Sequence, residues 1–477
     1  MHGFGRLRRL EVRSVTRNGR RGTTGIGAFR GFVAAGIVAV AVPAARGQEI
    51  DLDSAIHMAL ESNQAFQAVV EKRVEVQSAI AEARADAFPQ LSLYAGWNQS
   101  RNPSFLNSRD FEDILNQFPG ADFSPRAQDL YATGLRLSQP LFTFGKIGAA
   151  VQLARLAASA TEAQVEVARL DTALAAAEAY YGLLAAREQV RTLELEQQSR
   201  AEALAVVQAR FDIGEATRLE LLQAQAALAE VSPTVEGARG GLLVAETRLR
   251  AVLGLWAGAS LTVRPVEGDP PAPPDSGILA RAGWVRRPEL AALELEREAR
   301  RRQERVITAD GLPRIDLSGS WGRQVRLLEN LDRSLFDDWR VSVDLSWSLF
   351  DGGRRRGQAA AVRSVQRQLE LRLADTENRV ALEVEQAVTG YRTALARLEA
   401  ARQARDAARE ARRVAEETYQ LGAAIFADVL DAQRREVQAE VNAVASYFEA
   451  WVGAARLARA VGRVPGVAWD GNGWKQE

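Results

Sequence analysis

Two halves of this sequence resemble each other, and this internal repeat constrains the fold more than any other feature. Arg-Phe-Asp-Ile-Gly at 210–214 returns as Thr-Tyr-Gln-Leu-Gly at 418–422, a shift of 208 positions (422 minus 214). The same shift relates Leu-Gln-Ala-Gln at 222–225 to Leu-Asp-Ala-Gln at 430–433. Long repeats of this kind are structural units that bury their apolar faces against one another. We therefore expect this order: a first repeat at 48–256, a connector at 257–287, a second repeat at 288–462 and a tail at 463–477.

The N-terminus has the layout of a secretory signal peptide. Arginine is frequent at the start, an apolar run follows from Phe32 to Val42, and small residues come next at Ala45 and Gly47. A basic, then apolar, then small-residue order is typical of exported chains. The apolar run is shorter than the roughly 20 residues that a membrane-spanning helix needs. We therefore expect residues 1–47 to be a cleaved signal peptide.

Charge and composition argue against several classes of function. Lys and Arg together number 61, as do Asp and Glu, so the chain has no net charge with which to attract nucleic acid. Cysteine is absent, and the two histidines, His2 and His57, belong to no metal-binding or nucleophile pattern. We therefore expect no enzyme, no catalytic or metal-binding residues, no cofactor and no nucleic-acid partner.

Four short segments alternate between apolar and polar residues with a period of two. They lie at 91–97, 131–137, 315–321 and 339–349. Alternation over about ten residues with aromatic residues near the ends is typical of membrane-spanning strands, although a half-buried strand of a soluble sheet alternates as well. We predict strand pairs at about 89–143 and 313–350. The clearest segment has these apolar residues on one face: Trp339, Val341, Val343, Leu345, Trp347 and Leu349.

The remaining sequence is rich in Ala, Glu, Arg, Gln and Leu, which favour helices. Apolar residues step by three and four, as in coiled coils. Proline is absent from 146–210, so one helix there would extend about 100 Å at 1.5 Å per residue. We predict long helical hairpins at 146–253 and 354–461, and shorter helices at about 65–88 and 289–312. Four independent soluble coiled-coil helices are the alternative, which leaves the strand pairs unexplained.

The predicted segments point to an assembly of several chains. Four strands cannot close a barrel, and open strand edges do not occur in lipid. Three chains would supply twelve strands and begin to leave a lumen. The predicted fold class is an α+β membrane protein with long antiparallel coiled-coil helices and four transmembrane strands per chain. Its trimer would join a helical tube to a twelve-stranded barrel.

Motifs in both halves resemble those of the TolC-type outer-membrane efflux and secretion channels. They include Leu-Ser-Gln-Pro-Leu-Phe at 137–142, Leu-Phe-Asp-Gly-Gly at 349–353 and Arg-Pro-Glu-Leu at 287–290. The resemblance covers nearly all of the chain after the signal peptide. It implies a homotrimer in outer-membrane lipid of a Gram-negative bacterium, with a helical periplasmic domain. It also implies a periplasmic membrane-fusion adaptor and an inner-membrane pump of the RND or ABC type as partners.

The function implied by this resemblance is passive export across the periplasm and outer membrane, in efflux or type I secretion. A helical entrance gate would open on docking to the adaptor and pump. The alternative function is a periplasmic coiled-coil adaptor or scaffold, which would lack four lipid-compatible strands.

The resemblance also implies roles for particular residues. Turns at the periplasmic tip would contact the adaptor through Phe211, Gly214, Tyr419 and Gly422, and the two glycines would adopt left-handed conformations. Junctions between barrel and helices would be formed by these residues: Pro140, Phe142, Gly145, Phe350, Gly352 and Gly353.

The entrance gate would contain Asp428, Asp431, Tyr419 and Glu220. The two aspartates lie three positions apart on one helix and match acidic rings that narrow the family's tunnel, where three copies would attract cations. A solvated acidic first turn, favoured by the helix dipole, is the alternative. Tyr419 and Glu220 match a hydrogen-bonded latch, in which Glu220 replaces a shorter aspartate.

A second latch of the family has no equivalent in this sequence. Its arginine corresponds to Ala424 and its polar partner to Leu219. We therefore expect the entrance to be held less firmly, or by other contacts.

Overall fold

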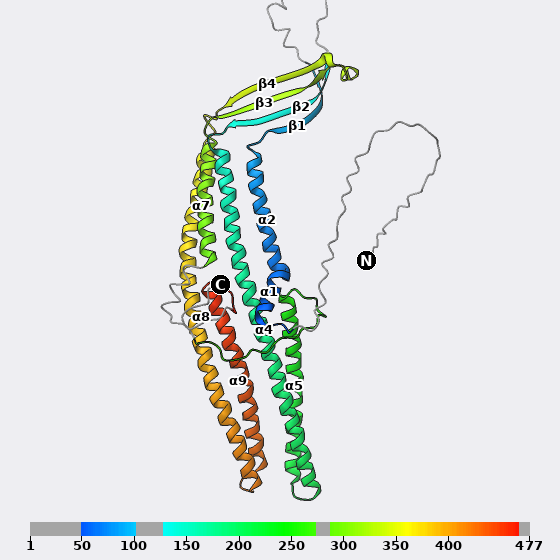
Figure 1. The fold of residues 1–477 in the computed structure, drawn as a ribbon, viewed down its shortest axis with the longest axis vertical. Helices are drawn as coiled ribbons and strands as arrows, with labels where there is room; N and C mark the ends of the chain where they lie inside the picture. Colours follow the sequence, from blue (N-terminus) through cyan, green and yellow to red (C-terminus); the bar gives the residue numbers. More distant parts are fainter. Residues whose placement is uncertain (1–48, 102–126, 273–286, 467–477) are drawn as a thin grey trace, which may run out of the picture. The chain divides into compact units, whose positions relative to one another are not determined.

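The computed structural model describes residues 49–101, 127–272 and 287–466. The predicted signal peptide lies outside the described residues, as do parts of the first strand loop, the connector and the tail. Within residues 47–477, which form one compact unit, long helices carry a sheet at one end (Figure 1).

The helices repeat with equal lengths in the two halves. The long helices α4 (Lys146–Asp212) and α8 (Arg354–Gln420) have 67 residues each. Their return helices α5 (Arg218–Val252) and α9 (Phe426–Ala460) have 35 each. The shorter helices α2 (Gln64–Ala85) and α7 (Pro288–Ala309) have 22 each, and α1 (Leu52–Ser62) precedes α2. These lengths confirm the predicted long helices.

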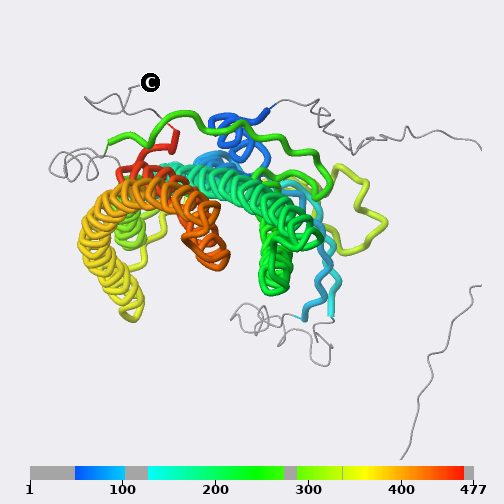
Figure 2. Tube along the Cα trace, turned by 90° about the horizontal axis from the view of Figure 1, so that it is seen from below, coloured from blue at the N-terminus to red at the C-terminus, as the bar shows by residue number. Residues whose placement is uncertain are grey.

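Short helices pack along each long helix. Both α2 and α5 contact α4, while both α7 and α9 contact α8. Three further helix contacts join the halves: α4 with α7, α4 with α9, and a smaller one of α5 with α9. In Figure 2, α1 and the segment 255–272 lie on one side of α4, and the tips of α5 and α9 lie on the other.

Four strands form one antiparallel sheet in the order β1-β2-β3-β4. They are β1 (Gln90–Ser100), β2 (Gln128–Phe142), β3 (Arg314–Val325) and β4 (Asp337–Ser346). The short 3-10 helices η2 (Leu328–Asn330) and η3 (Ser334–Phe336) lie between β3 and β4.

Apolar side chains gather on one face of this sheet. Leu93 pairs with Leu135, Leu135 pairs with Trp321, and Trp321 pairs with Trp339. Directly paired residues of neighbouring strands point to the same face. Leu93 is 76% exposed and Trp339 72% exposed, so nothing else in the described chain covers this face.

The prediction that β4 continues to Leu349 is wrong. The strand ends at Ser346, and the indole of Trp347 donates a hydrogen bond of 3.0 Å to the Gly311 carbonyl. The chain then turns into α8 through Gly352 and Gly353, which have φ values of +68° and +87°. The apolar alternation runs past the strand end, so the sequence pattern alone does not show where hydrogen bonding to β3 stops.

The described part of the connector predicted at 257–287, residues 257–272, is anchored to the middle of the helices. Val263 forms a bridge with Ile50 and is buried against α4. The Tyr180 hydroxyl donates a hydrogen bond of 2.6 Å to the Arg264 carbonyl, and burial raises the pKa of Tyr180 to about 12. The Tyr447 hydroxyl donates to the Gly268 carbonyl at 2.6 Å. Tyrosines of α4 and α9 therefore fix this segment against the helices.

None of the helices in the described parts of the chain has a stretch long and apolar enough to cross a membrane.

Candidate functional site

Glycines close the two helix turns in the same way. Gly214 and Gly422 have φ values of +83° and +73°, a conformation that disfavours a side chain. The Glu215 amide donates to the Arg210 carbonyl at 2.8 Å, and the Ala423 amide donates to the Thr418 carbonyl at 2.9 Å. These bonds satisfy carbonyls that the helix end leaves free. The predicted left-handed glycines are confirmed.

Both turns expose large apolar side chains. Ile213 precedes the first glycine and Leu421 the second, and these repeat counterparts are 71% and 83% exposed. Ile425 follows the second turn and is also exposed. Phe211 and Tyr419, by contrast, are only partly exposed. The tips therefore carry apolar surface that nothing in the described chain covers.

A hydrogen bond joins the two hairpins just above their turns. The Tyr419 hydroxyl of α8 donates to Oε1 of Glu220 in α5 at 3.0 Å. The other oxygen, Oε2, accepts from the Thr217 amide at 2.7 Å and from the Thr217 hydroxyl at 3.0 Å. The Glu220 side chain therefore reaches both groups, capping its own helix and bonding to the second hairpin.

This contact changes the acidity of both groups. The hydrogen bond from the Thr217 backbone, more than the one from Tyr419, holds the pKa of Glu220 below its usual range. Burial, followed by the hydrogen bond to Glu220, raises the pKa of Tyr419. Near neutral pH the pair is therefore an ionised carboxylate that accepts from a neutral hydroxyl.

Arg210 also belongs to this contact. Its Nη1 lies 3.5 Å from the Tyr419 hydroxyl, and its guanidinium carbon lies 5.8 Å from the centre of the tyrosine ring. At the repeat position the second hairpin has Thr418. Nothing in the sequence pattern indicates this role, because Arg210 reads as one more polar residue in the last turn of α4.

The two aspartates lie in the first turns of α9. Asp428 accepts a hydrogen bond of 3.2 Å from the Ile425 amide, so it caps the helix. Asp431 forms an ion pair of 2.9 Å with Arg435 and lies 3.7 Å from Arg434. The sequence prediction did not consider these two arginines, which balance the acidic pair within a single chain.

An apolar cluster lies beside the latch. Its buried members are Val207 of α4, Ala224 of α5, and Phe426 and Leu430 of α9. The ring centres of Phe426 and Tyr419 are 5.6 Å apart. The cluster therefore combines residues from both hairpins.

The predicted junction residues lie where the sheet meets the long helices. Gly145 and Gly353 are the N-cap residues of α4 and α8, both in the left-handed region. Phe144 adopts a left-handed conformation at the position where the repeat has Gly352. The register of β2 against β3 shifts between Pro140 and Phe142. The side chains of Phe142 and Phe350 are exposed.

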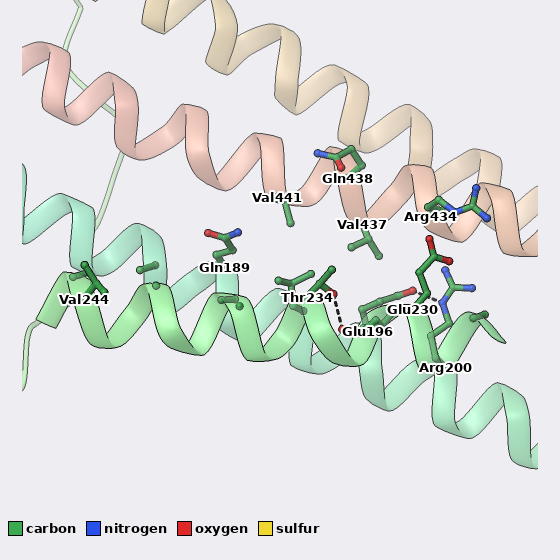
Figure 3. Close-up of a pocket in the computed structure, with 18 of the residues that line it drawn as sticks. Gln189, Glu196, Arg200, Glu230, Thr234, Val244, Arg434, Val437, Gln438 and Val441 are labelled. Carbon is green, nitrogen blue, oxygen red and sulfur yellow. Dashed lines mark hydrogen bonds and ion pairs between the residues drawn. The ribbon is translucent and has the colours of Figure 1, made fainter. Parts of the chain in front are cut away.

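A groove of about 1080 Å³ runs between α4, α5 and α9 (Figure 3). Its α4 residues include Gly182, Ala186 and Gln189. They lie on the face opposite Tyr180 and Leu184, which pack against α1 and the connector. At one end lies the buried ion pair of Glu196 and Arg200, where burial raises the pKa of Glu196 despite the neighbouring guanidinium. The groove also contains Thr234 and Val244 of α5, and Val437, Gln438 and Val441 of α9.

Among the described residues, no group of three or more His, Asp or Glu side chains could hold a metal ion.

Comparison with known proteins identifies the fold and the family. The family model for the outer membrane efflux protein matches residues 55–255 and 284–463. The alkaline protease secretion protein AprF of Pseudomonas aeruginosa is 25% identical, over 79% of this chain and 77% of its own. The outer membrane protein TolC of Vibrio cholerae is 21% identical, over 85% and 89%.

Solved structures agree with this assignment. The crystal structure of the outer membrane protein VceC from Vibrio cholerae superposes with a TM-score of 0.68 at 23% identity. The superposition covers 86% of this chain and 96% of VceC. The chain therefore belongs to the outer membrane efflux protein family and is an outer-membrane protein of a Gram-negative bacterium with a periplasmic helical domain.

Proposed function

We propose that three copies of this chain form a passive exit duct across the periplasm and the outer membrane. The observation that carries the proposal is the exposed apolar face of the sheet, held at one end of two 67-residue helices. Lipid covers such a face once strands from three chains close into a twelve-stranded barrel. A periplasmic coiled-coil scaffold, the alternative function, leaves this face in water.

The helices of the three copies would form the wall of a tube. The groove lined by Gly182 and Gln189 opens away from the face of α4 that α1 and the connector cover. We propose that the face of α4 that lines the groove points to the lumen of the tube, because α1 and the connector cover the opposite face. Helices of 67 residues extend about 100 Å, which suits a conduit through the periplasm.

The exposed tips are the proposed docking surface for a periplasmic membrane-fusion adaptor. Ile213 and Leu421 offer apolar side chains beside Gly214 and Gly422, in equivalent places of the two hairpins. An adaptor with apolar residues at its own end would cover them. An inner-membrane pump of the RND or ABC type would supply the energy, as the family suggests.

The gate would lie at the same end. The bond between Tyr419 and Glu220 ties the two hairpins of one chain together, so opening requires its loss. Asp428 and Asp431 would ring the entrance in the trimer, with Arg434 and Arg435 one turn further on. This placement predicts a cation-binding site at the entrance. The positive charges of Arg434 and Arg435 should lower its affinity for cations.

Charge substitutions on the two faces of β4 test the proposal. Val341→Asp places a carboxylate on the apolar face, where lipid is proposed, and should abolish insertion into lipid vesicles. Charge on a lipid face costs about 2–4 kcal/mol near the bilayer centre, although less for Asp than for Arg. Arg340→Asp is the matched control, because Arg340 is exposed on the opposite face and already charged.

The measurement is flotation of the purified protein with vesicles, together with native mass spectrometry of the extracted complex. We expect the parent and Arg340→Asp to float as trimers and Val341→Asp to remain in the soluble fraction. A parent protein that stays monomeric and soluble would support the scaffold instead.

A further inference from the structure

Phe426 is the first residue of α9, at the tip of the second hairpin, and it is buried. Only 7% of its side chain is exposed. Its repeat counterpart, Arg218, is the first residue of α5 and is exposed to solvent. The first position of a helix at a hairpin tip is an unusual place for a buried aromatic ring. Part of the burial of Phe426 comes from its own hairpin, where its ring centre lies 5.6 Å from that of Tyr419 and Leu430 belongs to the same cluster.

The rest of its burial comes from the other hairpin. The residues that cluster with Phe426 include Val207 of α4 and Ala224 of α5, both buried. The partly buried Leu204 and Leu221 pack against the same cluster. The ring of the second hairpin thus lies against apolar residues from both helices of the first.

The hydrogen bond between Tyr419 and Glu220 differs from the apolar contacts of Phe426 in what happens when water reaches it. When the hairpins part, the Tyr419 hydroxyl and the Glu220 carboxylate can each bond to water instead, so their net contribution is small. Phe426 has no such replacement, because its exposed ring would face water. Ala424 and Leu219 add no polar contact here, since neither side chain can form a hydrogen bond. The apolar contact is therefore the stronger of the two.

We propose that Phe426 is an apolar pin that holds the second hairpin against the first and keeps the entrance closed. The pin rests on the proposed duct and gate function and identifies the group that regulates the gate. Opening requires withdrawal of the ring from between α4 and α5. A docked partner would open the entrance by covering the ring with apolar surface of its own.

Substitution of Phe426 tests the pin by single-channel conductance in planar bilayers. Phe426→Ser should raise the fraction of time spent in the high-conductance level about tenfold over the parent. Phe426→Leu keeps an apolar side chain of similar size and should stay near the parent. Arg218→Ser, at the counterpart position, should not change the conductance. Tyr419→Phe should raise the open fraction by a smaller factor than Phe426→Ser.

A second variant covers the case in which Phe426→Ser does not assemble. Val207→Ser removes the contact from the side of α4 and should open the channel in the same way. If the parent conducts and the serine variants that assemble have the same open fraction as the parent, the pin is overturned. The pin is also overturned if neither serine variant assembles but Phe426→Ala assembles and has the open fraction of the parent. Failure of the parent itself to conduct would refute the duct, and that outcome is distinct from failure of the pin.

Discussion

The two hairpins have similar backbone structures but differ in the side chains at their tips. Their helices have the same lengths, and each turn closes on a left-handed glycine. At the tips, however, the first hairpin contributes Glu220 and Arg210, and the second contributes Tyr419 and Phe426. Each hairpin therefore holds complementary parts of one contact.

The return helices differ as well. Pro233 and Gly240 lie inside α5, whereas α9 has Val441 and Phe448 at the same repeat positions. Proline removes a helix hydrogen bond, and glycine adds freedom to the unfolded chain. The first return helix is therefore intrinsically less stable than the second, although both span 35 residues.

Transfer of the proline to the second helix should have the largest effect. Val441→Pro places proline in the interior of α9 and should lower the free energy of unfolding by about 3 kcal/mol. Pro233→Ala should raise it, because α5 gains the missing hydrogen bond. Denaturant unfolding followed by circular dichroism measures both. Equal effects of the same sign would show that the two return helices do not differ as described.

Glycine substitution should have a smaller effect of opposite sign. A Cβ atom at Gly240 would meet nothing within 4 Å. Gly240→Ala should therefore raise the free energy of unfolding by roughly 0.5–1 kcal/mol. Ala445→Gly, in the interior of α9 at the repeat position of Gly237, is a change in the opposite direction and should lower it by a similar amount. A loss of stability in Gly240→Ala would mean that the assembly brings another chain against this glycine.

Acid should break the latch formed by the hydrogen bond between Tyr419 and Glu220. We expect this effect to be smaller than those of the proline and glycine substitutions. The pKa of Glu220 lies below its usual range because the Thr217 backbone donates to it, with help from Tyr419 and Arg210. A lowered pKa means that the contribution is complete above about pH 4.5 and is lost as the pH falls through the lowered value.

Conductance as a function of pH measures this release. The open fraction should rise modestly below about pH 4.5 in the parent. It should rise less in Glu220→Gln, which keeps an acceptor for Tyr419 but cannot titrate. An identical acid response in both proteins would show that Glu220 is not the group responsible.

Sequence patterns predict the regular parts of this fold well. Helix periodicity and the absence of proline from 146–210 indicate the long helix, and the repeat transfers that prediction to α8. Gly214 and Gly422 mark the turns because left-handed backbone favours glycine. These features depend on local backbone preferences, which a single sequence contains.

The contacts between hairpins could not be predicted in the same way. Phe426 is one apolar residue in an amphipathic helix, and periodicity does not say which helix covers it. Arg210 looks like a solvated charge until Tyr419 of the other hairpin is placed beside it. The alternation that predicts β4 continues beyond Ser346 although the strand does not. Tertiary packing decides each of these, and periodicity carries no information about partners distant in sequence.

The most direct test of the duct is single-channel conductance of the purified protein, with a multivalent cation added on the side of the helix tips. A trimeric duct with an acidic entrance should show a steady conductance of trimer size that the cation blocks from that side alone. Asp428→Asn combined with Asp431→Asn should relieve the block. Conductance without any such block would remove the acidic entrance, and absence of conductance from a protein that assembles would contradict the duct.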